Sequence, residues 1–270
     1  MILIHSAFHS EAKAFIEHYE LKLLHELDNF NVFRSADHLL IVSGLGKVNT
    51  AVAIGYLSAK FPSISHYFNI GICGANDKFQ IGELVVPNKI VDLSTKKTFY
   101  PELQLKVDFK EGILGTSLTP VIKEIDDIDF YDMEAASFFE AASKFQSSSR
   151  IHTLKVISDN LVFENIKKEV IEKLIGARVI EIARYMDSIC SYSVNKKHDL
   201  SDDEIDSLSC FSEKHRLTVS QKNSMFQKAL GFKVRGGNVE SISKIKAKCI
   251  NSNKKDRNEL FREVEKLFSS

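Results

Sequence analysis

Three acidic residues occupy places in the chain where a carboxyl group could do chemistry. Glu11 follows the first apolar run, Glu134 follows the run 130–133, and Asp159 follows the run 154–157. Ligand sites in α/β folds lie where strands end and helices begin. Burial at such a place raises a carboxyl pKa and suits the group to acid or base catalysis near neutral pH. An acid in the first turn of a helix also interacts favourably with the helix dipole, so position alone leaves both interpretations open.

Two glycine-containing segments follow apolar runs, at residues 43–49 and 69–75. Glycine at such a place lets the backbone approach a ligand closely, although tight packing is the alternative explanation. The first segment lacks the third glycine of a dinucleotide-binding fingerprint, and Lys47 is not in a P-loop context. Dinucleotide and P-loop nucleotide binding are therefore not predicted.

The elements that must position these residues alternate between strands and helices over the first 190 residues. Apolar runs predict strands at 1–4, 38–43, 66–72, 82–86, 90–91, 112–116 and 152–157. Apolar residues at helical spacing predict helices at 10–19, 49–60, 134–144 and 164–189. This alternation predicts an α/β fold whose central, mostly parallel twisted sheet is flanked by helices.

The composition of the chain changes after residue 190. Residues 191–206 are rich in Ser, Asn, Lys and Asp and predict a linker, and residues 207–270 predict a helical C-terminal extension. Residues 207–257 contain 12 basic and three acidic residues. We interpret this basic segment as a solvated helical face or a contact with the acidic domain at 1–190, with nucleic-acid binding as the alternative.

The overall composition excludes several classes of protein. The chain has 270 residues, 44% of them hydrophobic and 27% charged, which excludes a disordered or collagen-like chain. No apolar run is long enough to span a membrane. The N-terminal apolar stretch, residues 1–5, has no basic residue before it and is too short for a signal peptide, so a cytoplasmic protein is expected. The four cysteines are far apart, which predicts reduced thiols and no metal site, and no cofactor is expected.

Taken in order, these segments resemble the purine nucleoside phosphorylase and nucleosidase superfamily, most closely its methylthioadenosine/S-adenosylhomocysteine nucleosidases. The matching segments are 44–51, 69–75, 81–86, 132–136 (Asp-Met-Glu-Ala-Ala) and 156–159 (Val-Ile-Ser-Asp). The resemblance covers about residues 1–190 and implies a nucleoside phosphorylase-like fold.

The resemblance also implies an activity, hydrolysis of the N-glycosidic bond of a purine nucleoside of the adenosyl class with release of the free base. Asp159 would protonate the base, with Ser158 holding its carboxyl group. Glu134 would bind the ribose hydroxyls and stabilise the developing oxocarbenium cation, with Met133 against the sugar. Glu11 would activate the attacking water, so the implied chemistry is general acid and base catalysis without a metal.

The same resemblance assigns further substrate contacts to Ala7, Ile72, Cys73 and Gly74. It implies a small-molecule purine nucleoside as the ligand and a homo-oligomer, a dimer or larger. The family's base-gripping aromatic is missing from 115–121, which leaves the exact base and the 5′ substituent open.

Two alternative functions remain at the level of the sequence. A phosphate-dependent nucleoside phosphorylase would carry one Arg in the loop at 5–11 and another at the position of Asn69, and both are missing here, which favours water. A non-catalytic nucleoside or nucleic-acid binding protein is the other alternative. Retention of Glu11, Glu134 and Asp159 argues against it, because a binding protein has little use for a water-activating glutamate.

Overall fold

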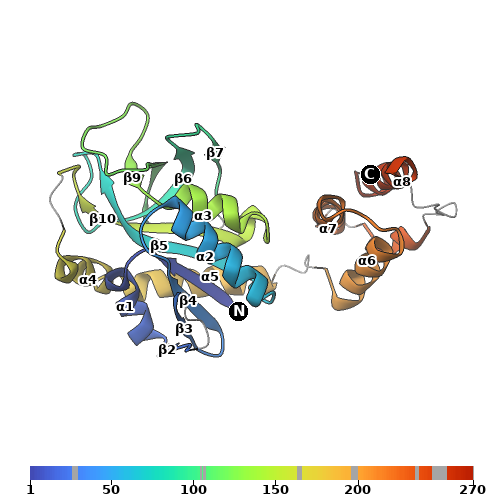
Figure 1. Ribbon diagram of the computed structural model, residues 1–270, viewed down its shortest axis with the longest axis horizontal. Coiled ribbons are helices and arrows are strands. Elements are labelled where there is room, and N and C mark those ends of the chain that lie inside the picture. Colours follow the sequence, from blue (N-terminus) through green and yellow to red (C-terminus); the bar gives the residue numbers. More distant parts are fainter. Residues whose placement is uncertain are drawn as a thin grey trace. The chain divides into compact units, whose positions relative to one another are not determined.

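The chain divides into two compact units, Met1–Cys190 and Ser191–Ser270 (Figure 1). The computed structural model describes residues 1–25, 30–103, 105, 108–162, 166–195, 200–234, 237–244 and 254–269. In these residues, no helix is both long enough and apolar enough to cross a membrane.

The larger unit alternates between strands and helices. Its elements, in chain order, are β1 (Ile2–Ser6), α1 (His9–His18), β2 (Lys22–Leu23), β3 (Asn31–Arg34), β4 (His38–Val42), α2 (Lys47–Lys60), β5 (His66–Ala75), β6 (Leu84–Asp92), β7 (Thr98–Phe99), β8 (Lys110–Thr116), β9 (Phe130–Asp132), α3 (Ala135–Ala142), a 3₁₀ turn (Ser148–Arg150), β10 (Ile151–Asp159), α4 (Lys168–Gly176) and α5 (Val179–Asn195).

The strands of the described residues form one mixed sheet in the order β10-β6-β8-β9-β5-β1-β4-β3-β2, with β7 paired to β6. Strand β1 pairs in parallel with β4 and with β5, and β5 also pairs in parallel with β10. Strand β10 also pairs antiparallel with β6, and β9 pairs antiparallel with β5. Strands β5, β9, β8, β6 and β10 therefore form a closed ring.

The α/β fold class is confirmed, and the sheet is mixed and partly closed, with five parallel and five antiparallel strand pairs in the described residues where a mostly parallel sheet was expected. Antiparallel pairs join β2 to β3, β3 to β4 and β6 to β7, in addition to the two pairs that close the ring. Connections as short as those between β3 and β4 and between β6 and β7 permit only antiparallel pairing, because a parallel pair needs a long crossover.

Helices cover both faces of the sheet, as Figure 1 shows. Along β1, Leu3 packs in one apolar cluster with residues of α2 and α3, whereas Ile4 packs in a second cluster with residues of α1, α4 and α5. Along β5, Tyr67 and Phe68 divide between the same two clusters. A strand buried on both faces needs apolar residues throughout, which explains the continuous apolar runs in the sequence.

Three predicted elements differ from the observed ones. Strand β5 continues to Ala75, so the glycines of 69–75 lie inside a strand and not in a turn after it. The two short strands expected at 82–86 and 90–91 are one strand, β6. The helix expected at 164–189 is divided into α4 and α5, and its expected start at Glu164 lies outside the described residues.

The second unit is helical and has an apolar core of its own. It contains α6 (Asp202–Lys214), α7 (Val219–Val234), a 3₁₀ helix (Val239–Lys244) and α8 (Lys254–Ser269). Its buried apolar residues are Leu208, Phe211, Met225, Ala229, Val239, Ile242, Leu260, Val264 and Phe268. Residues 191–206, the expected linker, include the end of α5 and the start of α6.

Candidate active site

A cavity of about 700 Å³ opens where β1, β5, β9 and β10 end. Glu11, Glu134 and Asp159 all line it, although more than 20 residues separate any two of them in the chain. Five further residues of the expected site also line the cavity: Ile72, Cys73, Gly74, Met133 and Ser158. The fold thus brings together eight of the nine expected residues around one space.

The carboxyl group of Glu11 is held by three backbone N–H groups. Its Oε2 accepts hydrogen bonds from Ala7 N at 2.9 Å and Phe8 N at 3.0 Å, and its Oε1 accepts one from Ile72 N at 2.8 Å. Ala7, the ninth expected residue, therefore holds Glu11 through its backbone and is not part of the cavity lining. Burial raises the pKa of Glu11, whereas the charge of Lys155 and these N–H groups oppose that rise.

Two glycines of β5 provide the space for the carboxyl groups. A Cβ atom on Gly71 would lie 2.5 Å from Oε1 of Glu11, and one on Gly74 would lie 3.3 Å from Oδ1 of Asp159. A side chain at position 71 is therefore incompatible with the observed place of Glu11. The glycine segment 69–75 serves close packing against two acidic side chains, and the backbone of Ile72 supplies a hydrogen bond.

Glu134 lies between β9 and α3, at the N-cap position of the helix. Its Oε1 accepts a hydrogen bond of 2.8 Å from the backbone N–H of Gly46. Gly46 precedes α2 and has a φ angle of +94°, a conformation that favours glycine. Burial, followed by the negative charge of Asp132, raises the pKa of Glu134 to about 7, against the opposing effects of Lys155 and the Gly46 N–H.

A buried ion pair that was not expected from the sequence lies beneath these carboxyl groups. Nζ of Lys155 is 3.0 Å from Oδ2 of Asp132, and the two side chains are 2% and 1% exposed. Asp132 also accepts hydrogen bonds from Thr116 Oγ1 at 2.7 Å and Ala135 N at 2.8 Å. The sequence did contain a signal, because a lysine in the apolar strand 151–157 must have a buried partner.

Lys155 supplies a positive charge to a cluster of acidic groups. Burial lowers the pKa of Lys155, but the negative charges of Asp132, Glu134 and Glu11 raise it by more, so the net change is upward. The lysine is therefore charged, and its charge partly balances three carboxyl groups.

Asp159 ends β10 and is half-buried at the edge of the cavity. Its Oδ2 accepts a hydrogen bond of 2.7 Å from Ser158 Oγ, and its Oδ1 accepts one of 3.0 Å from Leu161 N. The Ser158 hydroxyl is also 3.1 Å from the carbonyl oxygen of Cys73. These contacts fix the carboxyl group of Asp159 beside β5. Cys73 itself is buried, and burial raises the pKa of its thiol.

A neutral hydrogen-bonded group occupies the position where a phosphorylase would carry a guanidinium group. The side chain of Asn69 is buried, and its Nδ2 lies 2.8 Å from Nδ1 of His5. Nε2 of His5 is 2.8 Å from Ser43 Oγ. Burial lowers the pKa of His5 to about 3, so its ring is neutral. Of the described basic side chains, those of His9 and Lys168 line the cavity, and neither is an arginine.

The chemistry available in this cavity is proton transfer and charge stabilisation by carboxyl groups. Across the parts of the chain that the structure describes, no group of three or more His, Cys, Asp or Glu side chains could hold a metal ion. Three carboxyl groups with different hydrogen-bond partners can combine an acid, a base and a stabiliser of positive charge.

No protein-family model and no curated protein sequence matches the chain. Solved structures do. The 5′-methylthioadenosine/S-adenosylhomocysteine nucleosidase of Helicobacter pylori, bound to butyl-thio-DADMe-Immucillin-A, superposes with a TM-score of 0.59 at 18% identity over 71% of this chain and 97% of that one. The corresponding enzyme of Neisseria meningitidis gives a TM-score of 0.57 at 16% identity over 68% and 98%.

Futalosine hydrolase of H. pylori gives a similar match, with a TM-score of 0.57 at 18% identity over 71% of this chain and 97% of that one. At such identities the likeness establishes a shared fold. The expectation of a nucleosidase-like fold is therefore confirmed.

Proposed function

We propose that this protein hydrolyses the N-glycosidic bond of a purine nucleoside of the adenosyl class and releases the free base. The observation that carries the proposal is the convergence of Glu11, Glu134 and Asp159 on one cavity. Solved structures of the same fold include nucleosidases with bound nucleoside analogues, which supports the same class of ligand here.

The proposed reaction divides three tasks among the three carboxyl groups. Asp159 donates a proton to the purine ring as the glycosidic bond breaks, so that the bond's electron pair leaves with a neutral base. Glu134 in its ionised form binds the ribose hydroxyls and stabilises the positive charge that develops on the sugar. Glu11 accepts a proton from the attacking water, which forms the new bond to the anomeric carbon.

The environment of each glutamate supports its proposed task. Burial raises the pKa of Glu11, and Lys155 and three N–H groups oppose that rise and so favour the ionised form, which a water-activating base requires. Glu134 has a pKa of about 7 in the free protein, so its charge can respond to the presence of a cationic sugar. Met133 lines the same cavity and offers an apolar surface to the ribose.

Water is favoured over phosphate as the nucleophile. A phosphorylase needs donors that bind a doubly charged anion, and guanidinium groups do this best. Asn69 has its amide directed to His5 and does not line the cavity. The carboxyl groups of Asp132 and Glu172 line the cavity together with the three proposed catalytic ones, and all of them would repel phosphate when ionised.

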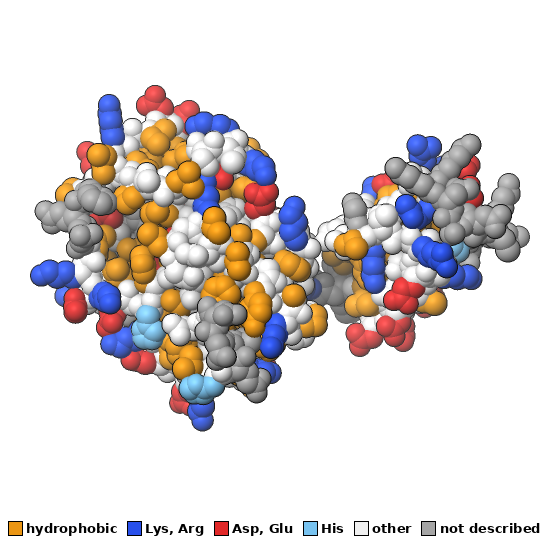
Figure 2. Space-filling model, in the orientation of Figure 1, with side chains coloured by type: hydrophobic (Ala, Val, Ile, Leu, Met, Phe, Trp, Pro, Cys, Tyr) orange, Lys and Arg blue, Asp and Glu red, His pale blue; other side chains and the backbone are white. Residues whose placement is uncertain are grey.

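We further propose a homo-oligomer that uses the outer face of α2. Leu45, Val48 and Val52 are 45%, 76% and 56% exposed. Figure 2 shows hydrophobic side chains across the face of the larger unit that α2 and α3 cover. Leu45 also lines the cavity, so a contact here would be continuous with the site. Sedimentation equilibrium should give a dimer or larger, and Val48→Glu should give monomers.

The second unit is proposed to be an accessory to residues 1–190. Its described basic residues are partly neutralised, because Lys228 pairs with Glu265 at 3.6 Å and Lys233 pairs with Glu204. A chain ending at Asn195 is expected to keep base release. Loss of turnover in this truncated chain would instead make the second unit part of the catalytic machinery.

The test is release of free base in phosphate-free buffer. The full-length protein is incubated with adenosine, 5′-methylthioadenosine, S-adenosylhomocysteine and futalosine, and free base is measured by chromatography. We expect release from at least one of these nucleosides, and its loss in Asp159→Asn and Glu134→Gln variants that bind ligand and remain folded. Release that requires phosphate and yields ribose 1-phosphate would establish a phosphorylase. Ligand binding without release would establish a binding protein.

A further inference from the structure

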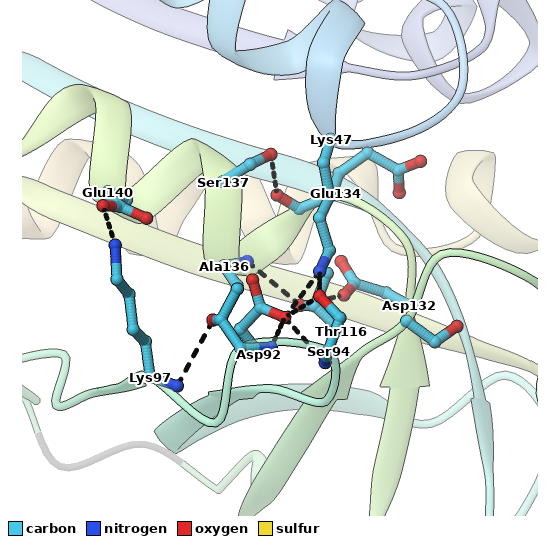
Figure 3. Close-up of polar contacts among 12 residues, drawn as sticks. Lys47, Asp92, Ser94, Lys97, Thr116, Asp132, Glu134, Ala136, Ser137 and Glu140 are labelled. Atoms are coloured by element: carbon cyan, nitrogen blue, oxygen red, sulfur yellow. Dashed lines mark hydrogen bonds and ion pairs between the residues drawn. The ribbon is translucent and has the colours of Figure 1, made fainter.

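Lys47 begins α2 immediately after the glycine that binds Glu134. Its Nζ donates hydrogen bonds to Asp92 Oδ1 at 2.6 Å and to Ser94 Oγ at 2.8 Å. The side chains of Lys47 and Asp92 are 13% and 9% exposed, so water screens this ion pair weakly. Figure 3 shows Lys47 extending from α2 toward Asp92 and Ser94, beside Glu134.

Asp92 is itself held firmly at the end of β6. Its Oδ1 also accepts hydrogen bonds from Ser94 N at 2.9 Å, Ser94 Oγ at 2.7 Å and Thr95 N at 3.1 Å. Burial would raise the pKa of Asp92, but the hydrogen bonds from Lys47 and Ser94 hold it below its ordinary value. The lysine therefore binds a fixed, ionised anchor in the sheet.

The segment between β4 and α2 is anchored at its start and at its end, and Asn49 Nδ2 donates to Leu45 O within it at 2.9 Å. At its start, Ser43 N bonds to Ser6 O at 3.0 Å and Gly44 N bonds to Ala7 O at 3.1 Å. A Cβ atom added to Gly46 would have no other atom within 4 Å, so packing around its α-carbon does not fix this glycine. Lys47, the next residue, supplies the anchor at the end of the segment.

The Gly46 N–H makes the one hydrogen bond that the described residues provide to the carboxyl group of Glu134. A shift of the loop by about 1 Å would break it, because N–H···O bonds need a separation near 2.9 Å. Resting on the proposed function, we propose that the ion pair between Lys47 and Asp92 positions the Gly46 N–H on Glu134. Lys47 and Asp92 are then positioning residues for the carboxylate that binds ribose.

The state of Glu134 reports on this arrangement. The charged groups that face it are Asp132 on β9, Lys155 on β10 and Glu11 on α1. Asp132 and Glu11 raise its pKa, whereas Lys155 and the Gly46 N–H lower it. Lys47 is not in contact with the carboxyl group, so replacing Lys47 acts on Glu134 through the loop. Withdrawal of the N–H is therefore expected to raise the pKa of Glu134.

The test measures the titration of Glu134 directly and needs no substrate. The full-length protein is labelled with ¹³C at glutamate carboxyl carbons, and the signal of Glu134 is assigned by its absence in Glu134→Gln. In Lys47→Met we expect the midpoint to move up by about 0.5 to 1 pH unit, the equivalent of one hydrogen bond. In Lys47→Arg the midpoint of Glu134 should stay close to that of the wild-type protein. Asp92→Asn should move the midpoint up as Lys47→Met does, and it replaces Lys47→Met if that variant fails to fold.

The matched control is the ion pair between Lys97 and Glu140, which also spans 2.6 Å (Figure 3). Glu140 lies on α3, the helix that has Glu134 at its N-cap position. It is 56% and 38% exposed and does not contact the glycine segment. Lys97→Met should leave the titration of Glu134 unchanged. A midpoint in Lys47→Met equal to that of the wild-type protein, or a shift of the same size in Lys97→Met, would overturn the proposal.

Kinetics separate this proposal from the proposed function. With a nucleoside that the wild-type protein cleaves, Lys47→Met should lower kcat/KM about fivefold to tenfold and move the acid limb of its pH profile upward. If the wild-type protein cleaves no nucleoside, the proposed function fails, while the titration of Glu134 still decides the role of Lys47.

Discussion

The surroundings of Glu11 and of Glu134 differ in how the chain holds a buried glutamate. Glu11 receives three N–H groups from two separate segments of the chain, and Gly71 allows it to lie against β5. Glu134 receives one N–H, which comes from a glycine loop. Both carboxyl groups are buried in the same cavity, and both are near Lys155.

This difference shows how one cavity can contain two glutamates with separate tasks. Several N–H groups favour the ionised form of a carboxyl group and fix its orientation. A single N–H leaves the second oxygen of Glu134 available to a ligand, while burial and then the charge of Asp132 raise its pKa to about 7. A water-activating base benefits from the first arrangement, and a group that binds ribose hydroxyls benefits from the second.

The largest effect is expected when the charge common to both regions is removed. Lys155→Met leaves Asp132, Glu134 and Glu11 without the buried cation that the structure places among them. The free energy of unfolding should fall by about 3 to 5 kcal/mol at neutral pH. Urea denaturation measures this loss, which should narrow at low pH as the carboxyl groups become protonated. Lys97→Met, which removes an exposed lysine, is the control and should leave the free energy of unfolding unchanged. A Lys155→Met protein as stable as that control would mean that Lys155 does not stabilise the three carboxyl groups.

The same substitution in the two regions should change stability by different amounts. The pKa of Glu134 is about 7 in the folded protein against an ordinary value of 4.5. Between these values the folded state holds more protons, so stability falls as pH rises through this window. Glu134→Gln cannot ionise and accepts the Gly46 N–H through its amide oxygen. It should therefore be more stable than the wild-type protein by about 3 kcal/mol above pH 8, and equally stable below pH 5.

Burial raises the pKa of Glu11 too, so loss of its charge also favours the amide at neutral pH. Glu11→Gln, however, loses hydrogen bonds that Glu134→Gln keeps and should therefore be the less stable of the two variants. An amide offers one acceptor oxygen, so its NH₂ group must face either the Ile72 N–H or the N–H groups of Ala7 and Phe8. An unsatisfied buried donor costs about 1 to 3 kcal/mol. Thermal unfolding of both variants across pH 5 to 9 makes the comparison. A Glu11→Gln variant as stable as Glu134→Gln at neutral pH would mean that the two regions do not differ as described.

Gly71→Ala tests the close approach on which the Glu11 region depends. The new Cβ atom would lie 2.5 Å from Oε1 of Glu11 and must displace the carboxyl group. Such overpacking costs about 1 to 3 kcal/mol of stability, and a displacement of about 1 Å costs on the order of 100-fold in turnover. Gly55→Ala on α2 is the matched control, because no atom lies within 4 Å of its added Cβ. That variant should gain about 0.5 to 1 kcal/mol and keep full turnover.

The smallest effect is expected at the third carboxyl group. Ser158→Ala removes the hydroxyl that donates to Asp159 Oδ2 at 2.7 Å, while the Leu161 N–H remains. Loss of one such bond costs about 1 kcal/mol, which corresponds to roughly fivefold in kcat/KM. Steady-state kinetics check this value. A loss as large as that of Asp159→Asn would mean that Ser158 does more than orient its neighbour.

The strands that were predicted correctly share a physical property with each other. Strands β1, β4, β5, β8 and β10 are largely buried, so their apolar runs are visible in the sequence. The two-residue strands β2 and β7 are mostly exposed and have no apolar run. The sequence predicts two strands in place of β6 because Asn88 and Lys89 interrupt the apolar pattern, at the point where the register of β6 with β8 shifts. The sequence predicts too large a share of parallel strand pairs, because the alternation of strands and helices does not reveal the short connections that join antiparallel strands.

The candidate site was partly visible in the sequence because its acidic residues follow buried strands. The contacts that distinguish them were not visible, since they join residues far apart in the chain. Gly46 binds Glu134, 88 residues later, and Ile72 binds Glu11, 61 residues earlier. The pairing of Lys47 with Asp92 is not visible in the sequence either, because the two residues are 45 positions apart. Tertiary contact, and not residue type, assigns these partners.

The central claim is that three converging carboxyl groups direct water onto the sugar of a purine nucleoside. The most direct measurement is mass spectrometry of the sugar product formed in phosphate-free H₂¹⁸O from a nucleoside that releases its base. We predict one ¹⁸O atom in each sugar, bonded to the anomeric carbon and measured before exchange with solvent, and no product from Glu11→Gln. Base release without ¹⁸O incorporation, or equal incorporation by the Glu11→Gln variant, would contradict the claim.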